Sequence, residues 1–293
     1  MSSTHLVRLA LAAALAGAMV LTAPVERAEA CSCAAPGDLG LLDPGPEVPL
    51  GTRGLLWAGR GTARPRDFAI TTTRGGKRHD VPVTLVPVGT WGEGTGRWNL
   101  VLVRPGRPLL AGVSYRFTTR RFDHDRSPSG GARVVTVQPG PAVLPASLNT
   151  TIGPVTSAGL EVISLAGDCS HTIDASQAKV EVVLPPALEP YRGQLLYRTF
   201  VDGKPWQPRT YLCAANAPGR SWQPTAGTDL VYSACDRSVD GPGLEAGVHE
   251  VSIEVAAPTL ADGYQVRTTP ASVRLGCVRQ RPGRPPRRPP SAP

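Results

Sequence analysis

The sequence predicts an all-β protein made of two tandem antiparallel β-sandwich domains. Short runs in which every second residue is apolar recur along the chain, as half-buried strands require. Turn-forming residues separate these runs, since the 293 residues include 32 Gly and 31 Pro. The chain after residue 30 shows no apolar pattern of helical period, and its length suits two modest domains.

The clearest strand–corner–strand segment is Trp98–Thr119. We expect its first strand to bury the face that begins at Trp98 and continues with Leu100 and Leu102. The sequence Arg104-Pro105-Gly106-Arg107-Pro108 ends that strand, because proline lacks the N–H that a ladder needs. In the second strand, one face carries Val113, Tyr115 and Phe117, and the other carries Ser114, Arg116 and Thr118.

Further strands are expected on both sides of this segment. In the first half they lie at Gly54–Ala58, Asp67–Thr73, Val81–Val88, Trp98–Val103, Val113–Arg120 and Ala132–Gln138. In the second half they lie at Gly159–Leu165, Lys179–Leu184, Gln194–Val201, Arg209–Ala214, Asp229–Cys235, Val248–Ala256 and Tyr264–Leu275. Asp202-Gly203 is a strong hairpin-turn signal after one of them.

A weaker copy of the strand–corner–strand segment occurs in the second half. Leu244-Glu245-Ala246-Gly247-Val248 repeats the Leu-x-Ala-Gly-Val pattern of Leu109–Val113, and both stand between two strand-like runs. Val251, Ile253 and Val255 then alternate in the following run. Two β-modules of similar plan explain this repetition, and chance similarity in a chain rich in Gly and Pro is the alternative.

The first module resembles bacterial immunoglobulin-like domains of exported proteins. Such domains carry a Pro-Leu-x-x-Gly-x-x-Tyr corner, matched here by Pro108, Leu109, Gly112 and Tyr115. The second module is similar to the same broad class, which includes fibronectin-III-like sandwiches. The resemblance implies an exposed β-sandwich that serves as a spacer, adhesin or accessory domain, and it implies no activity.

Residues 1–30 are expected to be a secretory signal peptide. An apolar run at residues 9–21 follows Arg8, and Ala28-Glu29-Ala30 fits the small-x-small cleavage pattern. Glu29 argues against a lipid-attachment box at Cys31, and no later stretch is apolar enough for a transmembrane helix. The expected division is an arm at 31–49, domain 1 at 50–138, a linker at 139–154, domain 2 at 155–277 and a tail at 278–293.

Six cysteines follow the expected cleavage site, and an even number in an exported chain predicts disulfides. They are Cys31, Cys33, Cys169, Cys213, Cys235 and Cys277. Of the three pairings open to the last four, we expect 213–235 and 169–277, because these would join neighbouring strands and the two ends of the second module.

The net charge of +8 does not indicate nucleic-acid binding. The expected tail, residues 278–293, carries five arginines and no acid, and residues 1–30 are neutral, so the rest of the chain has a net charge of only +3. Basic residues are not interleaved with aromatics as a single-strand binder requires. The tail is expected to be disordered and to attract anionic envelope polymers at most through simple charge.

The sequence offers no strong catalytic, metal or cofactor site, so we expect none of these. Asp168-Cys169-Ser170-His171 groups an acid, a thiol, a hydroxyl and an imidazole, but catalytic groups must converge in space, and Cys169 is better explained by a disulfide. Asp123-His124-Asp125 could supply metal ligands, yet turns also favour these residues. Phosphate-loop, dinucleotide, HExxH and GxSxG motifs are absent.

The expected mature N-terminus, Cys31-Ser32-Cys33, resembles the Cys-x-Cys start of tissue-type metalloproteinase inhibitors. That resemblance implies zinc chelation by the terminal amine and carbonyl. The rest of that family's cysteine framework is not recognisable here.

Function is expected to be non-catalytic: binding, adhesion or structural support at the envelope or outside the cell. The partner would be an extracellular or envelope protein or polysaccharide, and the chain would be a monomer. Trp206 and Trp222 lie near prolines in predicted loops and are the candidate ligand-facing aromatics. The alternatives are a metalloprotease inhibitor and an enzyme whose site is assembled from loops.

Overall fold

A computed structural model describes residues 40–91, 98–119, 131–163, 170–206, 227–235, 243–261 and 263–277. Nearly every regular element in these residues is a β-strand, and the sheets are mainly antiparallel, which confirms the predicted all-β, sandwich-type fold. Within the described part of the chain, no helix has the length and apolar character needed to cross a bilayer.

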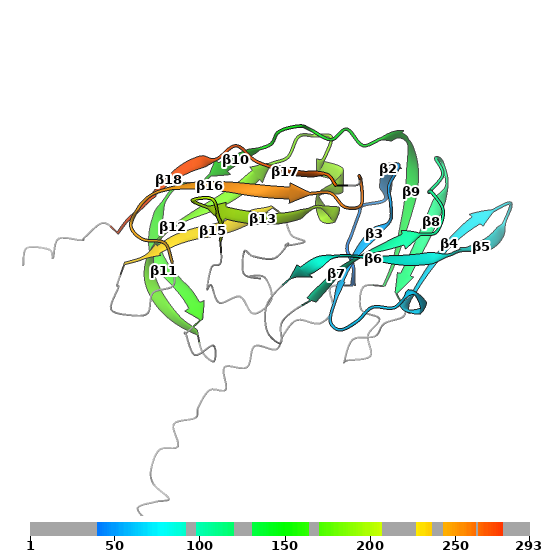
Figure 1. Ribbon diagram of the computed structural model, residues 1–293, viewed down its shortest axis with the longest axis horizontal. Helices are drawn as coiled ribbons and strands as arrows, with labels where there is room; N and C mark the ends of the chain where they lie inside the picture. Colours follow the sequence, from blue (N-terminus) through cyan, green and yellow to red (C-terminus); the bar gives the residue numbers. More distant parts are fainter. Residues whose placement is uncertain are drawn as a thin grey trace, which may run out of the picture. The chain divides into compact units, whose positions relative to one another are not determined.

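The strands of the first half form two sheets (Figure 1). One has the order β1-β3-β7-β6, made of Gly40–Leu41, Leu55–Gly59, Trp98–Pro105 and Val83–Trp91. The other has the order β2-β9-β8-β4-β5, made of Glu47–Leu50, Ala132–Pro141, Ser114–Thr119, Phe68–Arg74 and Lys77–Val81. A short 3-10 helix, η1 (Pro65–Asp67), precedes β4.

Facing side chains of these two sheets form one apolar core. Trp57 at its centre is fully buried, and its indole meets the Phe68 ring edge-on with centroids 5.7 Å apart. Gly59 stands beside this indole, where any Cβ would overlap the six-membered ring. Val101, Val103, Tyr115 and Phe117 complete the contact between the sheets.

The strands of the second half form two more sheets. In one, β12 (Ser170–Val183) pairs with β10 (Asn149–Ile152), β11 (Thr156–Ile163) and β15 (Thr228–Ala234). In the other, β16 (Gly247–Ala256) pairs with β13 (Leu196–Val201), β17 (Gln265–Arg267) and β18 (Ala271–Leu275), and β13 also pairs with β14 (Lys204–Pro205). The 3-10 helix η3 (Glu189–Gln194) precedes β13.

The expected alternation is confirmed in β8, where Tyr115 and Phe117 are buried while Arg116 is exposed. In β16 the two-residue period places Val251, Ile253 and Val255 in the second core, but Ser252 and Glu254 on the opposite face are buried as well. The hairpin turn at Asp202-Gly203 is also confirmed, with φ of +50° and +74° at the two residues. Both copies of the Leu-x-Ala-Gly-Val pattern lie on the path from a strand of one sheet to a strand of another, β7 to β8 and β15 to β16.

Several expected strands differ in extent. Residues 40–50, expected mostly as an irregular arm, contain β1 and β2, and the expected linker contains β10. The final expected strand is two strands, β17 and β18, and β12 begins at Ser170 instead of Lys179. Pairing with distant strands explains these differences: β2, for example, joins β9 in a parallel ladder. The strand expected at 209–214 lies outside the described residues, and the division into two domains stays a prediction.

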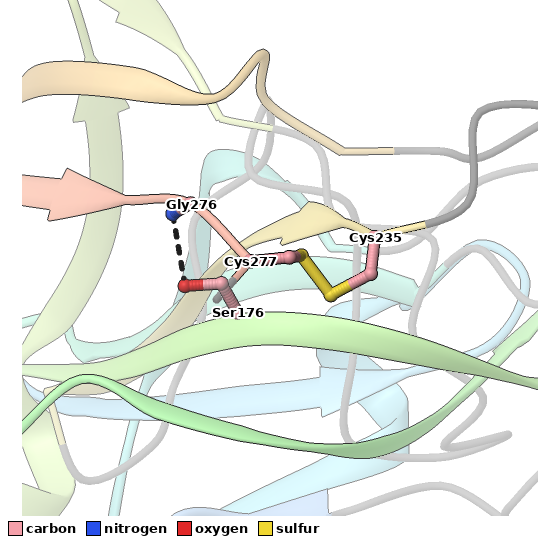
Figure 2. The surroundings of a disulfide bond; sticks show 4 residues. All are labelled: Ser176, Cys235, Gly276 and Cys277. Carbon is pink, nitrogen blue, oxygen red and sulfur yellow. Dashed lines mark hydrogen bonds between the residues drawn. A yellow bond between two sulfur atoms is a disulfide. The ribbon is translucent and has the colours of Figure 1, made fainter. Parts of the chain in front are cut away.

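Cys235 and Cys277 form a disulfide with their Cα atoms 5.4 Å apart. Figure 2 shows the bond beside a hydrogen bond in which the Gly276 N–H donates to the Ser176 hydroxyl at 3.0 Å. The bond therefore fastens the end of β15 to the residues after β18. The expected pairs 213–235 and 169–277 are both wrong, because Cys235 and Cys277 are bonded to each other. The other four cysteines lie outside the described residues.

A buried glutamine joins the second half of the chain to the first. The Gln194 side chain donates its Nε2–H to the Leu42 carbonyl at 2.7 Å and accepts the Leu56 N–H through Oε1 at 3.0 Å. It therefore continues the ladder in which the Leu42 N–H donates to the Leu56 carbonyl at 2.9 Å. Gly193 allows this approach, because a Cβ there would overlap the Asp43 carbonyl oxygen.

An apolar cluster surrounds this glutamine and buries the second face of the β3–β7 pair. Its members come from both halves: Leu42, Leu56, Ala58, Trp98, Leu100, Leu196 and Ala256. Trp98 is thus buried as expected, but it does not face the core between the first two sheets. Val101 and Val103 face that core instead.

Replacing Gln194 by Ala should lower the free energy of unfolding by about 2–4 kcal/mol, because it leaves one buried N–H and one buried C=O without a partner. Urea denaturation of the wild type and the variant measures this difference. Gln265→Ala is the matched control, since Gln265 is exposed. Equal effects of the two substitutions would contradict the role assigned to Gln194.

Candidate functional site

The Arg104–Pro108 segment, here called the RPGRP corner, is held tightly to the body of the protein. The Gly106 N–H donates to the Pro82 carbonyl at 2.6 Å, and a Cβ on Gly106 would lie 3.0 Å from the Pro82 Cβ. Pro82 itself lies between β5 and β6, where the chain leaves one sheet for the other. The corner is therefore fixed at a junction between the two sheets of the first half.

The chain after the corner is fixed as well. Leu109 is buried in the core between the sheets, and the Leu110 N–H donates to the Tyr115 hydroxyl at 3.1 Å. Gly112 has φ of +72°, in the left-handed region that favours glycine. These contacts hold the exposed side chains of Arg104 and Arg107 on a rigid base.

Two hollows flank the corner. The first, of about 690 Å³, is lined by residues of β4 and β5 and by residues in or next to the corner, including Arg74, His79, Asp80, Pro82, Arg107 and Leu110. The second, of about 660 Å³, includes Leu50, Arg53, Thr84, Arg104, Arg107 and Pro108. Arg107 and Pro108 line both hollows. Together the two hollows form what we call the corner site, and each has a volume that accommodates a small ligand.

The corner site is electrostatically positive. Arg74, Arg104 and Arg107 are exposed, and among the described residues none of them forms an ion pair with an acid. Asp80 is the one acidic residue in the described lining of the two hollows. The site can therefore attract an anion and offer it guanidinium donors.

A second arginine cluster, on β13 and β17, is partly neutralised by the carboxylate of Glu254. Arg198 donates to the Glu254 carboxylate, and a nitrogen of Arg267 lies 3.8 Å from the same carboxylate. The Arg267 guanidinium also covers the Phe200 ring at 3.6 Å from its centroid. Since one carboxylate already balances part of this charge and the Phe200 ring covers one guanidinium, the cluster stabilises the sheet and is a poorer anion site than the corner.

Trp206, a predicted ligand-facing aromatic, belongs to the protein core. It is 7% exposed, packs edge-on against Tyr232 at 5.7 Å and donates its indole N–H to the Leu230 carbonyl at 2.9 Å. Its backbone N–H also donates to the Thr199 carbonyl at 2.9 Å, which holds the residue against β13. Trp222, the other predicted aromatic, lies outside the described residues.

The remaining candidates fall wholly or partly outside the described residues. The residues that lie outside the described part of the chain are Asp168, Cys169, Cys31–Cys33 and residues 123–125. The backbone of Ser170 and His171 forms the start of β12. Within the described residues, no group of three or more His, Cys, Asp or Glu side chains is placed to hold a metal ion.

Sequence reasoning missed the corner site because it treated the RPGRP segment as a strand terminator. The sequence did contain one signal, since Arg104 and Arg107 flank a Pro-Gly pair that is typical of an exposed turn. The contributions of Arg74 and Arg53 carried no local signal, because they depend on the packing of distant strands.

Comparison with known protein families and with curated proteins finds no match to this chain.

Two titratable groups outside the corner site have shifted pKa values. The first is His249 on β16, whose Nδ1 lies 2.7 Å from the Asp202 carboxylate and whose Nε2 lies 2.8 Å from the Glu245 carbonyl. Burial opposes protonation, but the hydrogen bonds to Asp202 and Glu245 outweigh it and raise the pKa of His249 above 6.5. The charged ring can donate to both acceptors at once.

The second group is Asp229 at the start of β15, opposite the buried Val180. One carboxylate oxygen accepts the Leu230 N–H at 2.8 Å, and the other is buried with no hydrogen-bond partner among the described residues. Burial raises the pKa of Asp229 to about 6, although the hydrogen bond from the Leu230 N–H and the nearby Thr199 side chain act in the opposite direction. A buried carboxylate of this kind costs stability when it is charged.

Replacing His249 by Gln should destabilise the protein at pH 5.5 by on the order of 1 kcal/mol and much less at pH 8.5. Because the pKa of His249 is raised in the folded state, the charged ring contributes its full stabilisation to the folded state below pH 6.5. This stabilisation is lost as the pH rises through the pKa that His249 has in the folded state. Urea unfolding of both proteins at the two pH values gives this difference. A difference independent of pH would show that the charged pair contributes nothing.

Replacing Asp229 by Asn should stabilise the protein increasingly between pH 4 and pH 7, by about 2–3 kcal/mol at the upper end. The raised pKa means that the wild type loses stability as the pH rises from the unfolded-state value of 3.8 through about 6. The measurement is the difference in unfolding free energy between variant and wild type across that range. If the difference stays constant with pH, Asp229 does not titrate as assigned.

Proposed function

We propose that this chain is an exported, non-catalytic binding protein of the envelope or extracellular space, and that an anionic ligand binds at the corner site. The observation that carries the proposal is the set of exposed arginines, Arg74, Arg104 and Arg107, which have no acidic partner in the described part of the chain and line two hollows. Surface loops on a rigid β-scaffold are a frequent place for binding residues.

Export is supported by two features of different kind. The first 30 residues have the charge, apolar run and cleavage pattern of a signal peptide. The Cys235–Cys277 disulfide is of the kind that persists in oxidising compartments.

Immunoglobulin-like classification is supported by Tyr115. Its hydroxyl accepts a hydrogen bond from the backbone five residues upstream, at Leu110, which resembles the tyrosine corner of immunoglobulin-type sandwiches. Domains of that class commonly act as binding or spacer modules, and this fits a non-catalytic role.

The test is an NMR titration of the ¹⁵N-labelled mature chain with tripolyphosphate, a compact polyanion. Amide shifts should change at the non-proline residues of 79–82 and 104–110, which contribute to the corner site. The double variant Arg104→Gln/Arg107→Gln should weaken binding about tenfold or more, because two charge-assisted contacts are removed. Arg116→Gln/Arg274→Gln is the matched control, since both arginines are exposed and neither lines the hollows.

Shift changes confined to residues 278–293 would refute the proposal, because they would show that anions bind only the basic tail. Equal loss of binding in the control variant would refute it as well, since net charge alone would then explain the affinity.

A further inference from the structure

We infer that the ligand of the corner site is a linear acidic polysaccharide, one chain of which crosses the RPGRP corner and places carboxylates on arginines in both hollows. This inference rests on the proposed function and specifies the class of ligand.

The two hollows are connected through shared residues. Arg107 and Pro108 line both, whereas Arg74 lines the first alone and Arg104 the second. A ligand that fills both hollows therefore passes over Arg107 and Pro108. A linear polymer with repeated charges suits this arrangement, because successive anionic groups can reach arginines on each side of the corner.

Each hollow also presents an exposed apolar side chain. Leu110, which is 46% exposed, lines the first hollow, and Leu50, which is 37% exposed, lines the second. Sugar rings have apolar C–H faces that can cover such side chains, while their carboxylates receive paired hydrogen bonds from the planar guanidinium. An inorganic polyphosphate has the charge but no apolar surface.

The corner is poorly suited to an acidic peptide. Peptides that bind sheets usually gain affinity from main-chain hydrogen bonds. Pro82, Pro105 and Pro108 have no N–H, and the Gly106 and Leu110 N–H groups already donate to Pro82 and Tyr115. Recognition must therefore come largely from side chains, through charge and apolar contact.

Calorimetric titration of the full mature chain with galacturonate oligomers of two, four and eight units tests the inference. The affinity of the octamer should exceed that of the dimer by about tenfold or more, because one chain then engages both hollows. Arg74→Gln and Arg104→Gln should each reduce this gain, and Arg107→Gln should abolish most of it. The exposed arginines Arg116 and Arg274 supply the control substitutions to Gln, which should leave the gain unchanged.

Two further probes separate the possible outcomes. An eight-residue polyglutamate should bind at least about tenfold more weakly than the octamer, because it has the carboxylates but no apolar ring faces. Neutral maltooctaose should show no binding, because it has the ring faces but no charge. If polyglutamate binds as well as the octamer, the polysaccharide inference is overturned while the anion-binding proposal stands. If neither the octamer nor tripolyphosphate affects the corner site, both proposals fail together.

The basic tail needs its own control, because it could bind any polyanion. Replacing its five arginines by Gln should lower the affinity for every oligomer by a similar factor and leave the dependence on oligomer length unchanged. Loss of the length dependence in this variant would assign the polysaccharide to the tail and overturn the inference.

Discussion

The hydrogen bonds of one side-chain amide hold the two halves of the described chain in register. Gln194 places a donor and an acceptor against Leu42 and Leu56, where β1 and β3 separate and would otherwise leave two buried backbone groups unpaired. Such groups are costly in a dry interior, so the amide and the surrounding apolar cluster favour one arrangement over others. An apolar side chain at this position could fill the space but could not complete the ladder.

This junction determines which surfaces of the first half remain available for binding. Both faces of the β3–β7 pair are buried, one by the facing sheet and one by residues of the second half. The RPGRP corner lies at the end of β7 and stays exposed, although its backbone is fastened to Pro82. Exposed cationic side chains therefore stand on a backbone that loses little freedom when a ligand binds, which reduces the entropic cost of association.

The arginines of the two halves have different surroundings. On β13 and β17 the arginines surround Glu254 and a buried phenyl ring, so their charge contributes to the sheet itself. At the corner site Arg74, Arg104 and Arg107 lack acidic partners among the described residues, and their charge is available to a ligand. Both His249 and Asp229 have raised pKa values, so the folded state is stabilised when each is protonated. The two groups therefore favour the folded state at pH values below neutrality.

By itself the sequence determined the all-β class, the alternation of Tyr115 and Phe117 with exposed residues, and the Asp202-Gly203 turn. These three features are local, because they follow from the two-residue period of side chains along a strand and from the backbone preferences of turn residues. Only the tertiary structure decided that Trp98 packs toward the second half, that Cys235 bonds Cys277 and that Trp206 is buried. Such outcomes depend on which distant strands become neighbours, and local periodicity carries no information about that choice.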